Sequence, residues 1–261
     1  MGKIKLGFTT QDVIRAFPER NRLYLTRLLA EMVRQGMLLK VVRDRYLIIP
    51  FNADPESYVP DKHLVAKYIM QNKEYYIGYA SAMEIHGITH QSADKEYVVT
   101  KRQIQPSIRT HRGITYQFIH HDATRFFGFS SLWINRSEQA MVSDLERTIV
   151  DVATRPQLCG GIVELGKAIF QTTERIEHDK LFYYLSRNNI LAAKKRYLFL
   201  TEILDLEWTD DHKRMMKELG TSISLLDPAG PRQGPKKSNF GLKINVDPLL
   251  IKQRVLIKGH L

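Results

Sequence analysis

The stretch from Arg20 to Tyr46 constrains the fold most strongly, because a helical pattern gives way there to a strand pattern at a single glycine. Asn21 can cap a helix at its start, and Gly36 can stop it. Between them, apolar residues recur every three or four positions, at Leu25, Leu28, Leu29, Met32 and Val33. This spacing predicts an amphipathic helix with one apolar stripe.

The residues after Gly36 predict a β-hairpin. Two strands are expected, at about 38–42 and 45–49, around a tight turn at Arg43 and Asp44. Asp tolerates the left-handed backbone conformation that such a turn can require, although Gly would suit it better.

A shorter helix is expected before the long one. Thr9 or Thr10 can cap it, and it should end at Phe17 because Pro18 restricts the residue before it. The segment "KIKLGF" ahead of it can form a strand. Helix, turn, long helix and hairpin is the element order of a winged helix-turn-helix, whose long helix enters the major groove while its wing touches phosphates.

The arginines of the long helix give the expected contact residues. Arg20, Arg27 and Arg34 are seven residues apart, about two helical turns, so they line up roughly opposite the apolar stripe. We expect DNA contacts from the helical part and the wing, at Thr10, Arg20, Asn21, Arg22, Tyr24, Arg27, Lys40, Arg43 and Arg45. The alternatives are a solvated helix face and a module that binds another protein.

The net charge of +11 is concentrated at the two ends of the chain. Residues 1–50 hold ten Lys or Arg against four Asp or Glu, and residues 230–261 hold seven against one, whereas residues 51–229 hold 22 against 23. This segregation is typical of a surface that binds a polyanion. The basic loop at 230–240 adds three secondary nucleic-acid contacts, Arg232, Lys236 and Lys237, with a solvated loop as the equal alternative.

Composition places the chain among ordinary globular proteins, with 43% hydrophobic and 26% charged residues. Its apolar runs are too short to span a bilayer or to form a signal peptide, so we expect a cytoplasmic protein without a membrane partner. Cys159 is the single cysteine, which excludes an internal disulfide and a cysteine zinc cluster.

The remaining chain predicts a larger α+β domain. The expected organisation is a winged-helix domain at 1–50, a linker at 51–62 and an α+β domain at 63–261 with a sub-boundary near 140. "EYYIGYASAMEIHGI" reads as one small-residue helix that ends at Gly87, after a short helix over "HLVAKYIM". Three strands, "EYVVT", "ITYQFIHH" and "SSLWINR", are expected to form one antiparallel sheet.

The C-terminal half is mainly helical in this interpretation. The helix over "LERTIVDVAT" should be capped by Ser143, with Glu146 reaching back in a capping box and Arg147 pairing with Asp151 one turn on. Further helices are expected at about 161–172, 178–188, 192–204 and 210–219. Two final strands are expected within "SISLLD" and "FGLKINVD".

From the sequence we expect no catalytic residue, no metal and no cofactor. It contains no phosphate-binding loop and no nucleophile or zinc motif. His120, His121 and Asp122 could be metal ligands, but adjacent histidines at a strand end are expected at the surface. Asp144, Glu146 and Asp151 are explained by capping and pairing. Cys159, beside two glycines, is expected to be a packing residue. The lack of catalytic motifs favours a binding protein. The alternative is a nucleic-acid enzyme, either a nuclease or a transferase, whose winged helix brings it to its substrate.

Several short motifs in order resemble the AbiEi family of antitoxins, the DNA-binding components of type IV toxin–antitoxin and abortive-infection systems. They are the winged helix at 9–50, "YYIGYASAMEIHGI" with Ser81-Ala82 and His86-Gly87, "VSDLERTIVDVATRPQLCGGIVEL", and "NFGLKIN". The chain departs from the family pattern in its short first segment and in Asp44 at the wing tip, where Gly is common.

The resemblance implies a DNA-binding transcriptional repressor and antitoxin. Its N-terminal module would bind inverted repeats in double-stranded DNA of its own promoter. The remaining domain would counteract a nucleotidyltransferase-like toxin, without a stable complex between the two being implied. These are antiviral defence functions of the family, and they are expectations for this chain.

Overall fold

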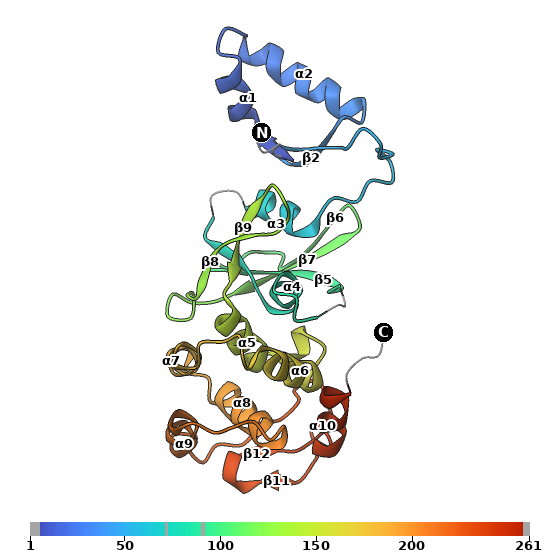
Figure 1. Ribbon diagram of the computed structural model, residues 1–261. Helices are drawn as coiled ribbons and strands as arrows, with labels where there is room; N and C mark the ends of the chain where they lie inside the picture. Colours follow the sequence, from blue (N-terminus) through green and yellow to red (C-terminus); the bar gives the residue numbers. More distant parts are fainter. Residues whose placement is uncertain (1–5, 71–72, 90–91, 258–261) are drawn as a thin grey trace.

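The computed structural model describes residues 6–70, 73–89 and 92–257. The protein has an α+β fold, as the sequence predicts, with three parts stacked along one long axis (Figure 1). An N-terminal module lies at one end, a mixed β-sheet lies in the middle, and a mainly helical layer lies at the other end. Within the described residues, no helix is both long enough and apolar enough to cross a membrane.

The N-terminal module has the elements and the order that the sequence predicts. They are β1 (Gly7–Thr9), α1 (Thr10–Ala16), α2 (Arg22–Arg34), β2 (Leu38–Val42) and β3 (Arg45–Ile48). The three strands form an antiparallel sheet in the order β1-β3-β2. The candidate strand over "KIKLGF" is therefore present at its C-terminal end, while residues 3–5 lie outside the described part.

The apolar stripe of α2 is narrower than its spacing suggests. Leu25 and Leu29 are buried and Met32 and Val33 are half-buried, but Leu28 is 41% exposed. Leu28 stands at the edge of the stripe.

The middle layer is a six-stranded sheet in the order β6-β7-β5-β4-β9-β8. Its strands are β4 (Tyr75–Ile77), β5 (Lys95–Thr100), β6 (Ile108–His111), β7 (Ile114–His120), β8 (Phe129–Trp133) and β9 (Gln139–Ser143). The sheet is mixed and not antiparallel as predicted, because β5 pairs with β7 and β4 pairs with β9 in parallel. Two helices flank it, α3 (Lys62–Met70) and α4 (Tyr79–Ile85).

The segment predicted as one small-residue helix is in fact a strand followed by a helix. Tyr75, Tyr76 and Ile77 form β4 near the centre of the sheet, and Gly78 separates them from α4. Aromatic and β-branched residues favour a strand, and a tight glycine turn breaks the helical pattern here. The central strand was therefore missed.

The helical layer follows the predicted boundaries closely. It contains α5 (Leu145–Thr154), the short 3-10 helix η1 (Pro156–Leu158), α6 (Ile162–Thr172), α7 (His178–Asn188), α8 (Leu191–Ile203), α9 (Asp210–Lys217), the 3-10 helix η2 (Ser238–Phe240) and α10 (Pro248–Leu256). A small sheet joins β10 (Ser224–Leu225), β12 (Leu242–Lys243) and β11 (Lys236–Lys237). The sequence interpretation missed α10, which Asp247 caps and Pro248 begins.

Helix α5 is capped by a different residue from the predicted one. Asp144 accepts a hydrogen bond from the backbone N–H of Arg147 and is the N-cap, whereas Ser143 still belongs to β9. The Ser143 hydroxyl instead lies 2.8 Å from that of Thr148. Both residue types cap helices well, and β9, a strand that was not expected from the sequence, extends through Ser143 and leaves Asp144 as the cap.

Strand alternation divides the core between the two faces of the sheet. Tyr75 and Ile77 belong to the cluster that includes α3, whereas Tyr76 between them belongs to the cluster of α5 and the helical layer. The cluster with α3 also contains Leu39, Val41, Leu47 and Ile49 of the N-terminal module. The module's sheet therefore packs on α3, and α2 lies on the outer side (Figure 1).

Candidate nucleic-acid interface

Local capping fixes how the two helices of the N-terminal module begin. Thr9 caps α1 in a capping box with Asp12, whose carboxylate accepts from the Thr9 backbone N–H at 2.8 Å. Asn21 caps α2, and its side-chain oxygen accepts from the N–H of Leu23 at 2.7 Å. The sequence predicted both caps, and they fix the residues at which α1 and α2 begin.

Most of the predicted DNA contacts are exposed. The side chains of Arg20 and Arg43 are 62% and 94% exposed, and Arg45 is half-buried. The other exposed members of the predicted set are Arg22, Tyr24, Arg27 and Lys40. The Arg20 guanidinium carbon lies 6.0 Å from the centre of the Tyr24 ring, within range of a cation–π contact.

Two of the predicted contact residues are used within the module. Thr10 is buried, and its hydroxyl donates to the Asp44 carboxylate at 3.2 Å, so it ties α1 to the wing and does not face solvent. Asn21 is exposed, but its oxygen is occupied by the helix cap. Thr10 therefore differs from the prediction.

The charge of α2 is uneven along its length. Arg34, on the same line as Arg20 and Arg27, is paired with Glu31, which also accepts from Gln35 at 2.8 Å. The C-terminal end of the helix is thus largely neutralised. Arg20, just before the helix, lies 3.9 Å from Glu19, so the charge that the ion pairs of the described residues leave unbalanced on α2 lies at Arg22 and Arg27.

A recess joins this end of the helix to the wing. Its volume is about 630 Å³, and its lining comes from the start of α1, the start of α2 and the wing turn. Four arginines, Arg15, Arg22, Arg43 and Arg45, border it together with Asp12 and Asp44. The recess is therefore net cationic.

The wing turn adopts the backbone conformation that the sequence predicts. Asp44 has a φ of 62°, in the left-handed region, and its carbonyl accepts from the Thr10 N–H at 3.1 Å. Asp is tolerated there because its short polar side chain can bond locally, as it does to Thr10. The Asp44 carboxylate also places one negative charge beside Arg43, 3.7 Å from its Nε.

The base of the module is fixed to the rest of the chain. A Cβ on Gly7 would lie 2.6 Å from both Leu47 and the Tyr68 ring, so glycine is required for this close approach. Glu138 is buried and accepts from the Leu6 N–H at 3.2 Å and from Lys67 Nζ at 2.7 Å. Helix α2, which carries Arg22, Arg27 and Arg34, lies on the side of the module away from the body of the protein (Figure 1).

The second predicted basic region lies at the opposite end of the molecule (Figure 1). Arg232 and Lys236 are exposed, whereas the side chain of Lys237 lies outside the described part. Lys236 stands directly opposite Lys243 in the antiparallel pair of β11 and β12, an unfavourable arrangement of like charges. Lys236 also contributes to lowering the pKa of Lys195, after the larger effect of burial.

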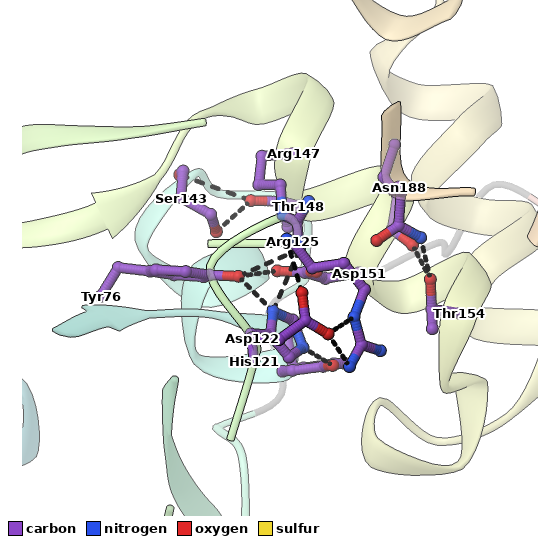
Figure 2. A network of polar contacts seen from close by, with 12 residues as sticks. Tyr76, His121, Asp122, Arg125, Ser143, Arg147, Thr148, Asp151, Thr154 and Asn188 are labelled. Carbon is purple, nitrogen blue, oxygen red and sulfur yellow. Dashed lines mark hydrogen bonds and ion pairs between the residues drawn. The ribbon is translucent and has the colours of Figure 1, made fainter. Parts of the chain in front are cut away.

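A buried polar cluster lies between the sheet and α5 (Figure 2). Arg147 and Asp151 form an ion pair with 2.7 Å between Nη2 and Oδ1, and both side chains are essentially inaccessible to solvent. The same Arg147 nitrogen lies 3.1 Å from Nδ1 of His121, and Tyr76 donates to Asp151 at 3.0 Å. Tyr79 lies 3.0 Å from the other ring nitrogen of His121.

The prediction of surface histidines is correct for His120 and wrong for His121. His121 is 2% exposed, and its pKa is lowered to about 4, mainly by burial. Asp151 opposes this shift, whereas Arg147 adds to it. Since a guanidinium only donates, Nδ1 of His121 accepts from Arg147 and the ring proton lies on Nε2, towards Tyr79. The predicted pair of Arg147 and Asp151 is confirmed, although its burial was not foreseen.

The acidic residues of α5 all have local partners. Asp144 caps the helix and accepts from Tyr184 at 3.0 Å. Glu146 accepts from the Glu177 N–H at 2.9 Å and lies 2.8 Å from Lys180, so it does not reach back as a capping box requires. Cys159 is buried beside a recess of about 270 Å³, and burial raises the pKa of its thiol. Within the described residues, no group of three or more His, Cys, Asp or Glu is placed to hold a metal ion.

Comparison with known proteins gives the fold and no family. No family model and no curated protein matches the chain. The chain is similar in structure to the RV2827C protein from Mycobacterium tuberculosis, with a TM-score of 0.64 over 97% of this chain and 90% of that one. The two are 16% identical in sequence, so the similarity concerns the arrangement of elements along nearly the whole chain.

Proposed function

We propose that this protein is a sequence-specific DNA-binding repressor and antitoxin, and that its N-terminal module binds double-stranded DNA at its own promoter. One observation carries the proposal. The start of α1, the N-terminal end of α2 and the wing turn present four arginines around one cationic recess. The two acidic residues that line this recess, Asp12 and Asp44, are bonded to threonines of the same module, and although Asp44 also lies 3.7 Å from Arg43, the four arginines outnumber them.

The arrangement divides the contacts into two kinds. The first turns of α2 carry Arg22 and Arg27, and arginine is the side chain that most often reads guanine in the major groove. The wing carries Lys40, Arg43 and Arg45, which suit contacts to phosphates. Phosphate contacts fix the orientation of the module, and base contacts select the sequence.

The resemblance to AbiEi antitoxins supplies the second half of the proposal. The domain after residue 62 would counteract a nucleotidyltransferase-like toxin, and repression by the N-terminal module would set the level of both proteins. A reading frame for such a toxin beside the coding sequence would support this half, and its absence would argue against it.

The DNA-binding half is tested by fluorescence polarisation with tiled duplexes from the region upstream of the coding sequence. We expect one duplex to bind specifically and its affinity to fall steeply with salt, because phosphate contacts release counterions. Arg22→Ala and Arg27→Ala should each weaken binding by about 1–3 kcal/mol.

Arg34→Ala is the matched control. It removes the same side chain from the same exposed helix face, but at a position already neutralised by Glu31. We expect its effect to be much smaller than that of Arg27→Ala. Binding that ignores sequence, or equal losses in all three variants, would contradict the proposal.

A further inference from the structure

Two large apolar side chains stand on the cationic face of α2. Leu23 is 59% exposed and Tyr24 is 53% exposed, although both lie in the first turns of the helix. At about 100° per residue, Leu23 lies about 40° around the helix from Arg27, whereas Leu28 lies about 100° away. Leu23 and Arg27 thus share one face, and Leu28 lies on the flank.

The two side chains differ in what they contact. Tyr24 lies beneath the Arg20 guanidinium. Within the described residues, Leu23 belongs to none of the hydrophobic clusters, including those of α2 and its small sheet. Its backbone N–H is held by Asn21, so the position of its Cα is fixed while its side chain points outward.

A single exposed leucine is ordinary on a protein surface. Here, however, it lies one helical turn from Arg27, on the end of the helix whose charge is not neutralised. The major groove offers one apolar group to such a side chain, the C5-methyl of thymine. The arginines would bring that groove to within contact distance of Leu23.

We infer that Leu23 reads a thymine methyl in the major groove, close to the base pair contacted by Arg27. This inference rests on the proposed function and deepens it by naming a base that the site recognises. Four residues of helix advance about 6 Å, and one base pair rises about 3.4 Å. The thymine therefore lies about two base pairs or fewer from the guanine that Arg27 contacts.

The experiment replaces each thymine of the bound duplex in turn with deoxyuridine, which removes the methyl and leaves base pairing unchanged. Wild-type protein should lose affinity by about fourfold at one or two positions, the effect of one buried methyl-sized group. Leu23→Ala should bind the thymine duplex more weakly and give a ratio of thymine to uracil affinity near one. Ala is a good helix former, so the variant keeps the helix.

Leu28→Ala is the control, because it removes the same side chain from the flank of the same helix. It should keep the wild-type preference for thymine, and circular dichroism checks that each variant is folded. Specific binding without any effect of uracil, or an unchanged thymine preference in Leu23→Ala, would overturn the inference while leaving the proposed function in place.

Two other outcomes are distinguishable. If no duplex is bound specifically, the proposed function fails and the inference fails with it. If Leu23→Ala changes the oligomeric state and leaves the thymine preference intact, the side chain belongs to a protein interface, and the inference is overturned.

Discussion

Arg147 is the largest fully buried side chain among the described residues, and its guanidinium fixes which nitrogen of His121 carries the proton. Asp151 balances the guanidinium, and Phe127 lies across it, with 4.4 Å between the guanidinium carbon and the ring centre. Gly128, at a φ of 73°, allows the chain to pass within contact distance of the Arg147 stem. The neutral ring of His121 completes the arrangement by accepting from Arg147.

The neutral state of His121 predicts a loss of stability in mild acid. Its pKa is about 4 when folded, against an ordinary 6.5, so the unfolded chain binds more protons between these values. The free energy of unfolding should therefore fall as pH is lowered from 6.5 towards 4, by about 3 kcal/mol from this group. Urea denaturation at a series of pH values measures it.

His121→Gln separates this effect from that of other titrating groups. The amide of Gln can still accept from Arg147 and donate to Tyr79, but it does not titrate. The variant should lose less stability than the wild type between pH 6.5 and 4. Parallel curves for the two proteins would show that His121 does not carry the acid sensitivity.

The position of His121 could have been found from strand alternation. Tyr116 and Phe118 face α3 in β7, and Ile119 faces the helical layer. His121 has the same parity as Ile119, so the α5 side of the sheet follows directly. The prediction of a surface position relied on the polar character of histidine, whereas the alternation of side chains along the strand indicates a buried position.

At the scale of elements, helices with caps and strong periodicity were predictable, whereas the pairing of the central strand was not. Asn21 and Gly36 bound α2 as expected, because these residues act through local backbone geometry. Strand β4 is three residues long and draws its stability from β5 and β9 on either side. Its partners are distant in sequence, so local pattern could not reveal the mixed sheet.

In the wing, the negative charge of Asp44 can be removed without changing the conformation of the turn between β2 and β3. Asp44→Asn keeps a side-chain oxygen for the Thr10 hydroxyl and tolerates the left-handed conformation. It removes a negative charge from the recess that Arg43 and Arg45 border. We expect unchanged thermal stability and DNA binding tighter by about fivefold, since unit charges about 4 Å apart interact by roughly 1 kcal/mol in water.

Fluorescence polarisation at two salt concentrations checks this prediction. The gain should shrink as salt rises, because the effect is one of exposed charge. Weaker binding by Asp44→Asn at low salt would mean that the carboxylate itself takes part in recognition, contrary to the arrangement described here.

At the scale of the whole molecule, the sequence indicates which residues are candidate DNA contacts, but it does not indicate how the module that carries them packs on the rest of the protein. The exposed arginines of α2 follow from helical spacing, whereas their direction depends on the packing of the module's sheet on α3. Gly7 and Glu138 make this junction, and their partners lie far away in the sequence. Nothing in the local pattern around either residue reveals those contacts.

Glu138→Ala tests this junction. The change leaves the Leu6 N–H and the Lys67 ammonium without their shared acceptor, so the free energy of unfolding should fall by about 1–3 kcal/mol. Limited proteolysis should also cleave the segment at 50–61 faster than in the wild type.

Glu74→Ala is the control, because Glu74 makes an exposed ion pair with Lys101. Its effect should stay within about 0.5 kcal/mol. Equal stability of the two variants, with the same rate of cleavage at 50–61, would show that the junction does not depend on Glu138.

The shared packing of the module and α3 has a geometric consequence for an operator with two half-sites. A DNA-binding module on a flexible linker could bind each half-site independently of the rest of the protein. A module packed against the rest of the protein instead fixes the orientation of the whole chain at each half-site. Each base pair inserted between the half-sites turns one copy by about 34° around the duplex. We therefore expect the separation of the repeats to be as strictly specified as their sequence.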